Sequence, residues 1–320
     1  NIPSRDFDET SYATTLQETL RMDEFIRTNA RIMDEFDPER TVAIYVDEWG
    51  TWYAPTEGTD PGFLEQQNSQ RDAVLAALNF NIFARNAERV RGANIAQMIN
   101  VLQAMILTNQ EQMILTPTYH AFRMYVPFQN ATRLGVRFQA GEYRHERVRL
   151  PRVDAMAARG ADGKIYLALT NLDPDRPATF AVRLAQGGVG AVVGETLAAP
   201  SYNSINSFDA PNTVAPRQAT VRLADGVVRN LVGAHQQLRL VAPAGQVLIV
   251  ELDKARRRPG ERVHPVGDGM HAVAGEHPVR HLGVALGDAV HVFAQVEREP
   301  RHVEAVLAGE ALERRKIDGR

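Results

Sequence analysis

Two adjacent carboxylates at the end of a short apolar run are the side chains best suited to chemistry. Residues 42–46 (Val-Ala-Ile-Tyr-Val) predict a strand buried on both faces, and Asp47 and Glu48 follow it directly. (β/α) barrels present catalytic groups in this way, at the C-terminal ends of their strands. Because successive strand residues point to opposite faces, Asp47 and Glu48 cannot both face one substrate. We favour Glu48, which is followed by Trp49 and Trp52. The alternative is an acidic strand end that only caps the next loop.

The elements around this run are expected to alternate between helix and strand. Apolar residues recur at helical spacing on both sides of it, and Asp37-Pro38 ends the first helix. Such alternation is typical of barrels and doubly wound sheets. The Pro- and Gly-rich loop 54–62 is of a length that usually shapes a substrate pocket. We expect helices over 11–36, 68–88, 98–107 and 118–128, and strands over 42–46, 90–96 and 113–115.

The pattern changes after residue 130, where short β-rich runs alternate with turn signals. Seven such runs predict an antiparallel β-sandwich. The fold class is therefore α/β plus all-β, with the C-terminal part of a (β/α)8 TIM barrel over 1–129 and a sandwich over 130–252. A barrel needs eight strands, so the others would precede Asn1. The sandwich strands are expected over 148–155, 164–170, 179–184, 190–198, 220–223, 236–241 and 246–252.

The last segment, 253–320, differs in composition from the rest of the chain. It holds six of the nine histidines and opens with three consecutive arginines at 256–258. Histidine clusters suggest metal binding, but no cysteine and no His-Glu-x-x-His motif accompanies them, so no metal site is predicted. We expect a solvated or disordered tail with a local helix over 304–315, and a fused or frame-shifted end is an alternative.

Composition excludes several classes of function. The formal net charge of −3 gives no reason to expect a nucleic-acid partner, and no apolar run is long enough to cross a membrane. The chain has no cysteine, which excludes disulfides and thiolate metal sites. With 320 residues it can bury a large core.

Three motifs in order resemble the C-terminal half of glycoside hydrolase family 51, the α-L-arabinofuranosidases. They are Asp-Glu-Trp-Gly-Thr-Trp-Tyr at 47–53, Arg-Gly-Ala-Asn-Ile-Ala-Gln-Met-Ile-Asn at 91–100 and Leu-Thr-Pro-Thr-Tyr-His at 115–120. Asn-Ser-Phe-Asp at 206–209 resembles part of the sandwich of that family. The resemblance covers roughly residues 1–252 and implies a retaining mechanism on a (β/α)8 barrel, without a metal or organic cofactor.

The resemblance also implies roles for individual residues. Glu48 matches the nucleophile, and Gln97 matches a residue that hydrogen-bonds the bound arabinofuranose. Trp52 matches an aromatic residue that lines the sugar pocket, and we add its neighbour Trp49 to the expected binding site. The alternative for Gln97 is a buried amide bonded to backbone, and the alternative for Trp52 is core packing.

One feature of the family is missing from this sequence. Retaining hydrolysis needs a second carboxyl group roughly 5–5.5 Å from the nucleophile. The family carries it in an Asn-Glu pair upstream, and no Asn-Glu pair occurs here. We therefore expect a fragment of an arabinofuranosidase that releases terminal arabinofuranosyl groups from arabinan or arabinoxylan. The alternatives are another retaining barrel glycosidase, such as an endoglucanase, and a non-catalytic, sandwich-containing interaction or sugar-binding module. The resemblance also suggests a cytoplasmic, homo-oligomeric parent enzyme.

Overall fold

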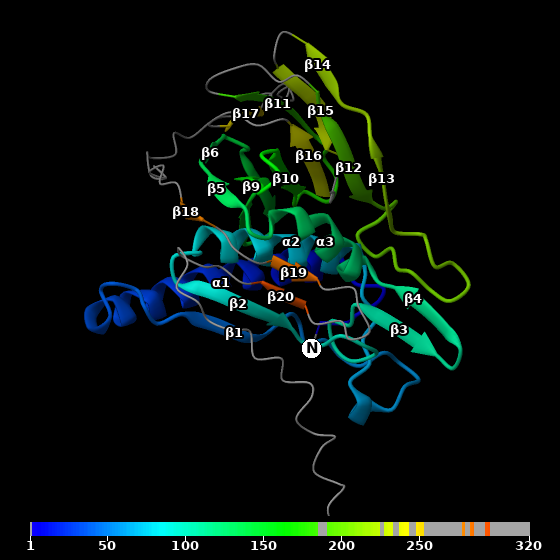
Figure 1. Cartoon of the computed structure of the whole chain (residues 1–320). Helices are drawn as coiled ribbons and strands as arrows, with labels where there is room; N and C mark the ends of the chain where they lie inside the picture. Colours follow the sequence, from blue (N-terminus) through cyan, green and yellow to red (C-terminus); the bar gives the residue numbers. More distant parts are fainter. Residues whose placement is uncertain are drawn as a thin grey trace, which may run out of the picture.

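The computed structural model describes the backbone of residues 2–184, 191–224, 227–232, 237–242 and 248–252, and of three short strands at 277–278, 282–284 and 292–294. Its side chains are described over 2–182, 191–223 and 227–228. The three α-helices within these residues form a central layer, as Figure 1 shows, with the strands β1 (Ile44–Trp49) and β2 (Val90–Ile95) on one side and the larger sheets on the other. No helix within the described residues is long and apolar enough to cross a membrane.

The first helix, α1 (Glu9–Phe36), confirms the predicted helix over 11–36. It begins where the Asp8 side chain accepts a hydrogen bond from the Ser11 amide at 2.8 Å. The first half of α1 is buried through residues such as Tyr12 and Leu16. The second half exposes Phe36, which is 84% accessible.

Strands β1 (Ile44–Trp49) and β2 (Val90–Ile95) pair in parallel, which confirms the two strands expected in the barrel segment. The expectation that the first strand is buried on both faces is wrong, because Tyr45 is 49% exposed. Its core-facing residues, Ile44 and Val46, pack against the buried cluster of the helices. Within the described residues β1 pairs with no strand but β2, and Tyr45, Asp47 and Glu48 along it are exposed.

The helices α2 (Gln70–Arg85) and α3 (Pro117–Tyr125) confirm two further predictions. A capping box formed by Ser69 and Asp72 starts α2, which is buried over all its residues except the last. Thr116 caps α3, and Pro117 occupies the first turn, where its missing amide costs nothing. There are also two short 3-10 turns. One, η1 (Pro61–Phe63), lies in the loop between β1 and α2, and the other, η2 (Val126–Phe128), directly follows α3.

The predicted helix over 98–107 is wrong. This stretch is a series of turns that leads into the hairpin of β3 (Ile106–Asn109) and β4 (Gln112–Leu115). Asn100 and Leu102 have φ angles of 58° and 50°, and residues in this left-handed region cannot continue a right-handed helix. The strand expected over 113–115 is confirmed in β4.

The later strands form two antiparallel sheets with the orders β13-β12-β16-β10-β9-β5-β18 and β14-β15-β11-β17-β6, where only β6 and β17 pair in parallel. The expected run over 148–155 is two strands, since β8 pairs with β7 in a hairpin and β9 joins the large sheet. The strands β5, β6, β7, β13 and β15 were not expected. The bounds are β5 (Thr132–Leu134), β6 (Val136–Arg137), β7 (Glu142–His145), β8 (Val148–Pro151), β9 (Val153–Arg159), β10 (Ile165–Asn171), β11 (Ala178–Leu184), β12 (Val193–Ala198), β13 (Ala215–Ala219), β14 (Arg222–Ala224), β15 (Val227–Val232), β16 (Gln237–Ala242) and β17 (Leu248–Leu252).

The buried core runs without a break across the domain boundary expected at 129/130. One cluster joins Phe80 of α2 and Phe122 of α3 to Tyr166 of β10 and Leu197 of β12. A second cluster lies between the two sheets, around Leu167 and Phe180. The boundary itself remains a prediction. In the tail the structure describes only β18 (His277–Pro278), β19 (Leu282–Val284) and β20 (Val292–Ala294), and the helix expected over 304–315 lies outside the described residues.

Candidate active site at the C-terminal ends of β1 and β2

The C-terminal ends of two parallel strands bring the predicted site residues to one edge. Trp49 is the register partner of Ile95, and the Ala96 amide donates a hydrogen bond to the Trp49 carbonyl at 3.0 Å. Glu48 therefore stands one residue before this contact on β1, and Gln97 stands one residue after it beyond β2. In a parallel sheet this edge is where loops and ligands meet.

Glu48 is exposed, and so is its neighbour Asp47. The strict alternation that we used to separate the two carboxylates does not hold, because the register of β1 and β2 shifts between Val46 and Trp49. Val46 and Trp49 both pack toward the core, and the two acidic residues between them both face away from it. The preference for Glu48 over Asp47 therefore rests on the family motif rather than on strand geometry.

The two tryptophans have opposite environments. Trp49 is 4% exposed, and its ring lies 5.6 to 5.7 Å from the rings of Phe80, Phe83 and Phe122. Trp52 is 69% exposed, so the core-packing alternative for Trp52 is wrong. The geometry thus supports a surface role for Trp52 and gives Trp49 a packing role.

Gln97 is exposed, so the alternative of a buried amide bonded to backbone is wrong. Within the part of the chain that the structure describes, no side chain forms a hydrogen bond or an ion pair with Glu48 or Gln97. Exposed polar groups at the end of a parallel sheet are open to a ligand, which is the arrangement expected for a substrate site.

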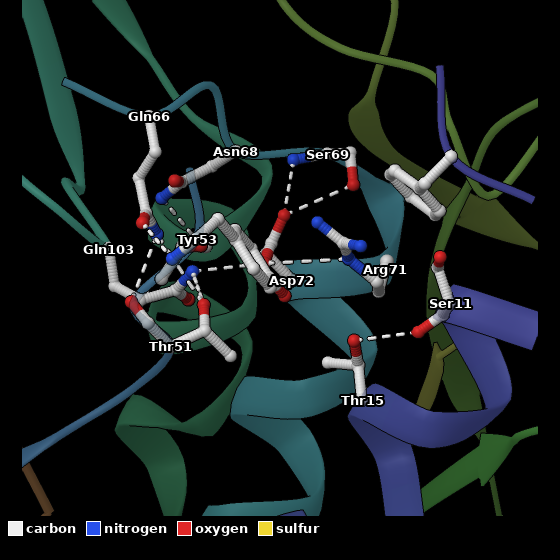
Figure 2. Close-up of polar contacts among 12 residues, drawn as sticks. Ser11, Thr15, Thr51, Tyr53, Gln66, Asn68, Ser69, Arg71, Asp72 and Gln103 are labelled. Carbon is white, nitrogen blue, oxygen red and sulfur yellow. Dashed lines mark hydrogen bonds and ion pairs between the residues drawn. The ribbon is translucent and has the colours of Figure 1, made fainter. Parts of the chain in front are cut away.

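A buried polar network holds Thr51 and Tyr53, the two sequence neighbours of Trp52, as Figure 2 shows. The Gln103 amide donates to Thr51 Oγ1 at 2.5 Å and to Asp72 Oδ1 at 2.9 Å. The Tyr53 hydroxyl donates to the same Asp72 oxygen at 3.0 Å. Gln66 completes the network, since its amide nitrogen donates to the Thr51 carbonyl and its oxygen accepts from the Tyr53 amide.

Arg71 extends this network toward the start of the chain. Its guanidinium carbon lies 3.5 Å from the centre of the Phe7 ring and 3.9 Å from that of Tyr53, so the buried cation is held between two aromatic faces. Burial, followed by the Asp72 carboxylate, raises the pKa of Tyr53 well above its ordinary value. The Tyr53 hydroxyl therefore stays protonated and remains a donor to Asp72.

The sequence analysis missed the residues of this network. Only Asp72 could have been found from a local sequence pattern, because Ser69-x-x-Asp72 is a helix-capping pattern at the start of α2. Gln66 and Gln103 follow no such pattern, since their partners lie far away along the chain. Among the described residues no three His, Asp or Glu side chains are grouped so that they could hold a metal ion.

Comparison with known proteins identifies the family to which these motifs belong. Residues 47–232 match the family model described as the α-L-arabinofuranosidase C-terminal domain, which is more than half of the chain. The chain belongs to the α-L-arabinofuranosidase family. This is a family of glycosidases, and the matched part is its C-terminal portion, as the sequence motifs predicted.

Individual arabinofuranosidases agree with this assignment. The chain is 38% identical to an intracellular exo-α-L-arabinofuranosidase of Bacteroides ovatus over 66% of this chain and 41% of that protein. Its structure matches the crystal structure of the GH51 arabinofuranosidase from Xanthomonas axonopodis pv. citri with a TM-score of 0.73 and 48% identity, covering 76% of this chain and 49% of the other. The Thermotoga maritima α-L-arabinofuranosidase in complex with arabinose, at 21% identity and a TM-score of 0.60, shares the fold. The chain spans less than half the length of the first two relatives.

Proposed function

We propose that this chain carries the nucleophile of a retaining α-L-arabinofuranosidase, and that the nucleophile is Glu48. The observation that carries the proposal is the shared edge of β1 and β2, where the Trp49–Ala96 hydrogen bond places Glu48 and Gln97 on adjacent strand ends. The family membership supports the reaction class, and the exposure of both side chains supports a role in contact with substrate.

Each residue has a defined task in the proposed reaction. The Glu48 carboxylate attacks the anomeric carbon while the bond from that carbon to the leaving oxygen breaks, which gives a glycosyl-enzyme ester. Gln97 hydrogen-bonds hydroxyl groups of the arabinofuranosyl ring, and Trp52 offers an exposed aromatic face to it. A second carboxyl group protonates the leaving oxygen and then activates the water that hydrolyses the ester. In the family it belongs to an Asn-Glu pair, which this sequence lacks. We place that group outside this chain, so the chain acts as part of a larger enzyme.

The substrates of the complete enzyme are proposed by the same reasoning. We assign it terminal α-L-arabinofuranosyl groups of arabinan, arabinoxylan or their oligosaccharides, without a cofactor. A relative that is named intracellular supports a cytoplasmic location for the enzyme, and a homo-oligomeric state is part of the proposal.

The assay is hydrolysis of p-nitrophenyl α-L-arabinofuranoside by the complete gene product that contains this chain. We expect release of p-nitrophenol with retention of anomeric configuration, observed by proton NMR. Cleavage of only another glycoside, such as a β-glucoside, would overturn the substrate assignment. Inversion of configuration would overturn the role of Glu48 as nucleophile.

The missing Asn-Glu pair favours one second candidate, a non-catalytic sugar-binding module. Calorimetric titration of the 320-residue chain with arabino-oligosaccharides separates the two candidates. We expect no tight binding by this chain alone, because half of the sugar-binding wall would come from elsewhere. Micromolar binding without any hydrolysis by the complete gene product would favour the module.

A further inference from the structure

Hydrogen bonds to buried side chains fix Thr51 and Tyr53, the two residues on either side of Trp52. Thr51 accepts two hydrogen bonds: its hydroxyl accepts one from the Gln103 side-chain amide, and its carbonyl accepts one from the Gln66 side-chain amide. Tyr53 donates two hydrogen bonds: its main-chain amide donates to the Gln66 side chain, and its hydroxyl donates to Asp72. Tyr53 is 4% exposed whereas Trp52 is 69% exposed. A large aromatic ring therefore stands in solvent on a loop whose two flanking residues are held by buried groups.

The two oxygens of Asp72 have different tasks. Oδ2 accepts from the Ser69 amide and hydroxyl, at 2.7 and 3.1 Å, and so caps α2. Oδ1 takes no part in the cap and accepts from Tyr53 and Gln103 instead. Asp72 is fully buried, and Oδ1 also lies 4.0 Å from Arg71 Nε, so a buried ion pair adds to the two hydrogen bonds that this oxygen accepts. One oxygen of this carboxylate therefore caps α2, and the other connects the start of α2 to Tyr53 and Gln103.

Gln103 connects the loops that follow β1 and β2. Its main-chain amide donates to the Ala96 carbonyl at 2.9 Å, next to Gln97. Its side chain reaches Thr51 and also lies against Gly50, where an added Cβ would come within 2.6 Å of Gln103 Cγ. Because a carboxylate only accepts hydrogen bonds, the amide nitrogen of Gln103 must face Asp72, which fixes the orientation of the side chain.

We propose that Asp72 and Gln103 are positioning residues that hold Trp52 as a rigid platform and fix the loop after Glu48 against the loop that carries Gln97. Neither residue touches the substrate. The loss of catalysis expected from changing them rests on the proposed function. The rigidity of Trp52 does not, because it follows from the contacts of this chain alone.

The rigidity can be measured on the 320-residue chain, because it has only two tryptophans. Trp49→Phe, in a pocket already lined by phenylalanines, leaves Trp52 as the single fluorophore. In this background we compare Gln103→Met and Asp72→Asn. Gln103→Met keeps the length of the side chain and its contact with Gly50 but removes both donated hydrogen bonds. Asp72→Asn is isosteric and can keep the cap through its oxygen, while its amide group would face the Gln103 donor.

The matched control is Asp154→Asn. Asp154 is also a buried carboxylate, 7% exposed, but its partners are Arg85 and Asn81. Far below the unfolding midpoint, Gln103→Met and Asp72→Asn should lower the fluorescence anisotropy of Trp52 and raise its acrylamide quenching constant. Asp154→Asn should lower the melting temperature without either change. If Trp52 anisotropy is unchanged in both network variants, or falls equally in the control, the proposal is overturned.

The consequence for catalysis is tested in the complete gene product with Trp49 intact. Gln103→Met should lower kcat/KM by up to about 10²-fold. Part of this decrease should come from a higher KM for the arabinofuranoside, because a misplaced Trp52 ring weakens substrate binding as well as substrate orientation. Asp154→Asn should leave both constants near those of the parent. Changed anisotropy in an enzyme without arabinofuranosidase activity would refute the proposed function and keep the positioning role. Unchanged anisotropy and unchanged kinetics in an active enzyme would refute the positioning role alone.

Discussion

The Ala96 main-chain amide donates a hydrogen bond to the Trp49 carbonyl at 3.0 Å, and this contact lies where the C-terminal ends of β1 and β2 meet. One residue away on each side stand Glu48 and Gln97. The contact continues the parallel register of Trp49 with Ile95, so it depends on backbone and not on side-chain identity. It explains how two residues 49 positions apart in the sequence, one the proposed nucleophile and the other the proposed sugar ligand, come to the same edge.

The choice between the two exposed carboxylates can be tested by isosteric substitution. Glu48→Gln in the complete gene product should reduce kcat for an aryl arabinofuranoside by at least about 10³-fold, because an amide cannot form the glycosyl ester. Asp47→Asn should retain most of the activity. The reverse pattern, with Asp47→Asn inactive and Glu48→Gln active, would assign the nucleophile to Asp47, which the shifted register also leaves exposed.

The two tryptophans should separate stability from binding. Trp49→Ala removes a buried ring from an aromatic cluster and should lower the free energy of unfolding by about 3–5 kcal/mol, measured by urea denaturation. Trp52→Ala removes an exposed ring and should change that free energy by less than about 0.5 kcal/mol. It should instead raise KM for the arabinofuranoside. A large loss of stability in Trp52→Ala would contradict the exposed position.

Gly50 should tolerate no side chain. Its φ angle is +130°, and an added Cβ would meet Gln103 Cγ at 2.6 Å. Gly50→Ala should cost roughly 1–3 kcal/mol of backbone strain and displace Gln103 from Thr51. Gly58, with φ +85° and no atom near an added Cβ, is the matched control for the strain alone. Gly50→Ala should lower the anisotropy of Trp52 and Gly58→Ala should not. Equal effects of the two would show that Gln103 is not packed against Gly50 in solution.

His120 should make the fold less stable in acid. Burial, with Arg123 adding to it, lowers the pKa of His120 to about 4, so the ring is neutral in the folded chain at pH 6 and protonated in the unfolded one. Since the unfolded state then binds more protons, stability should fall as the pH drops from 6.5 to 4, by on the order of 2–3 kcal/mol from this residue.

The measurement is urea denaturation at pH 7.5 and pH 4.5 for the parent and for His120→Leu. Neither ring nitrogen of His120 has a hydrogen-bond partner among the described residues, so the apolar variant should cost little at pH 7.5. It should lose less stability than the parent at pH 4.5. Equal losses would show that His120 is already exposed or protonated in the folded chain.

The sequence predicted the elements whose signals are local. The α1 helix has helical periodicity and a capping Asp8, and α3 has Thr116-Pro117 at its start, so both were predictable from nearby residues. The stretch 98–107 was misread because its apolar residues have helical spacing, while Asn100 and Leu102 adopt positive φ angles that no sequence pattern announced. The shift of register beyond Val46 was equally hidden, because it depends on the pairing of β1 with β2.

The candidate site divides in the same way. Glu48, Gln97 and Trp52 stood out through motifs, and the structure leaves all three exposed near one edge. The supporting network was not visible, because Gln103 bonds to Thr51 and Asp72 across 52 and 31 positions in the sequence. Such contacts arise from tertiary packing, and neither the composition nor the periodicity of the sequence predicts them.

Trapping of the glycosyl-enzyme intermediate would show directly whether Glu48 is the nucleophile of a retaining arabinofuranosidase. A suitable reagent is a 2-deoxy-2-fluoro-α-L-arabinofuranosyl donor with a dinitrophenyl leaving group. This leaving group departs with little protonation, and the fluorinated glycosyl-enzyme ester is then hydrolysed slowly. After its reaction with the complete gene product, peptide mass mapping should find one fluoroarabinosyl group on the side chain of Glu48. The label should be absent in Glu48→Gln. A label on any other residue, Asp47 included, or turnover of the donor without a covalent adduct, would show that Glu48 is not the nucleophile.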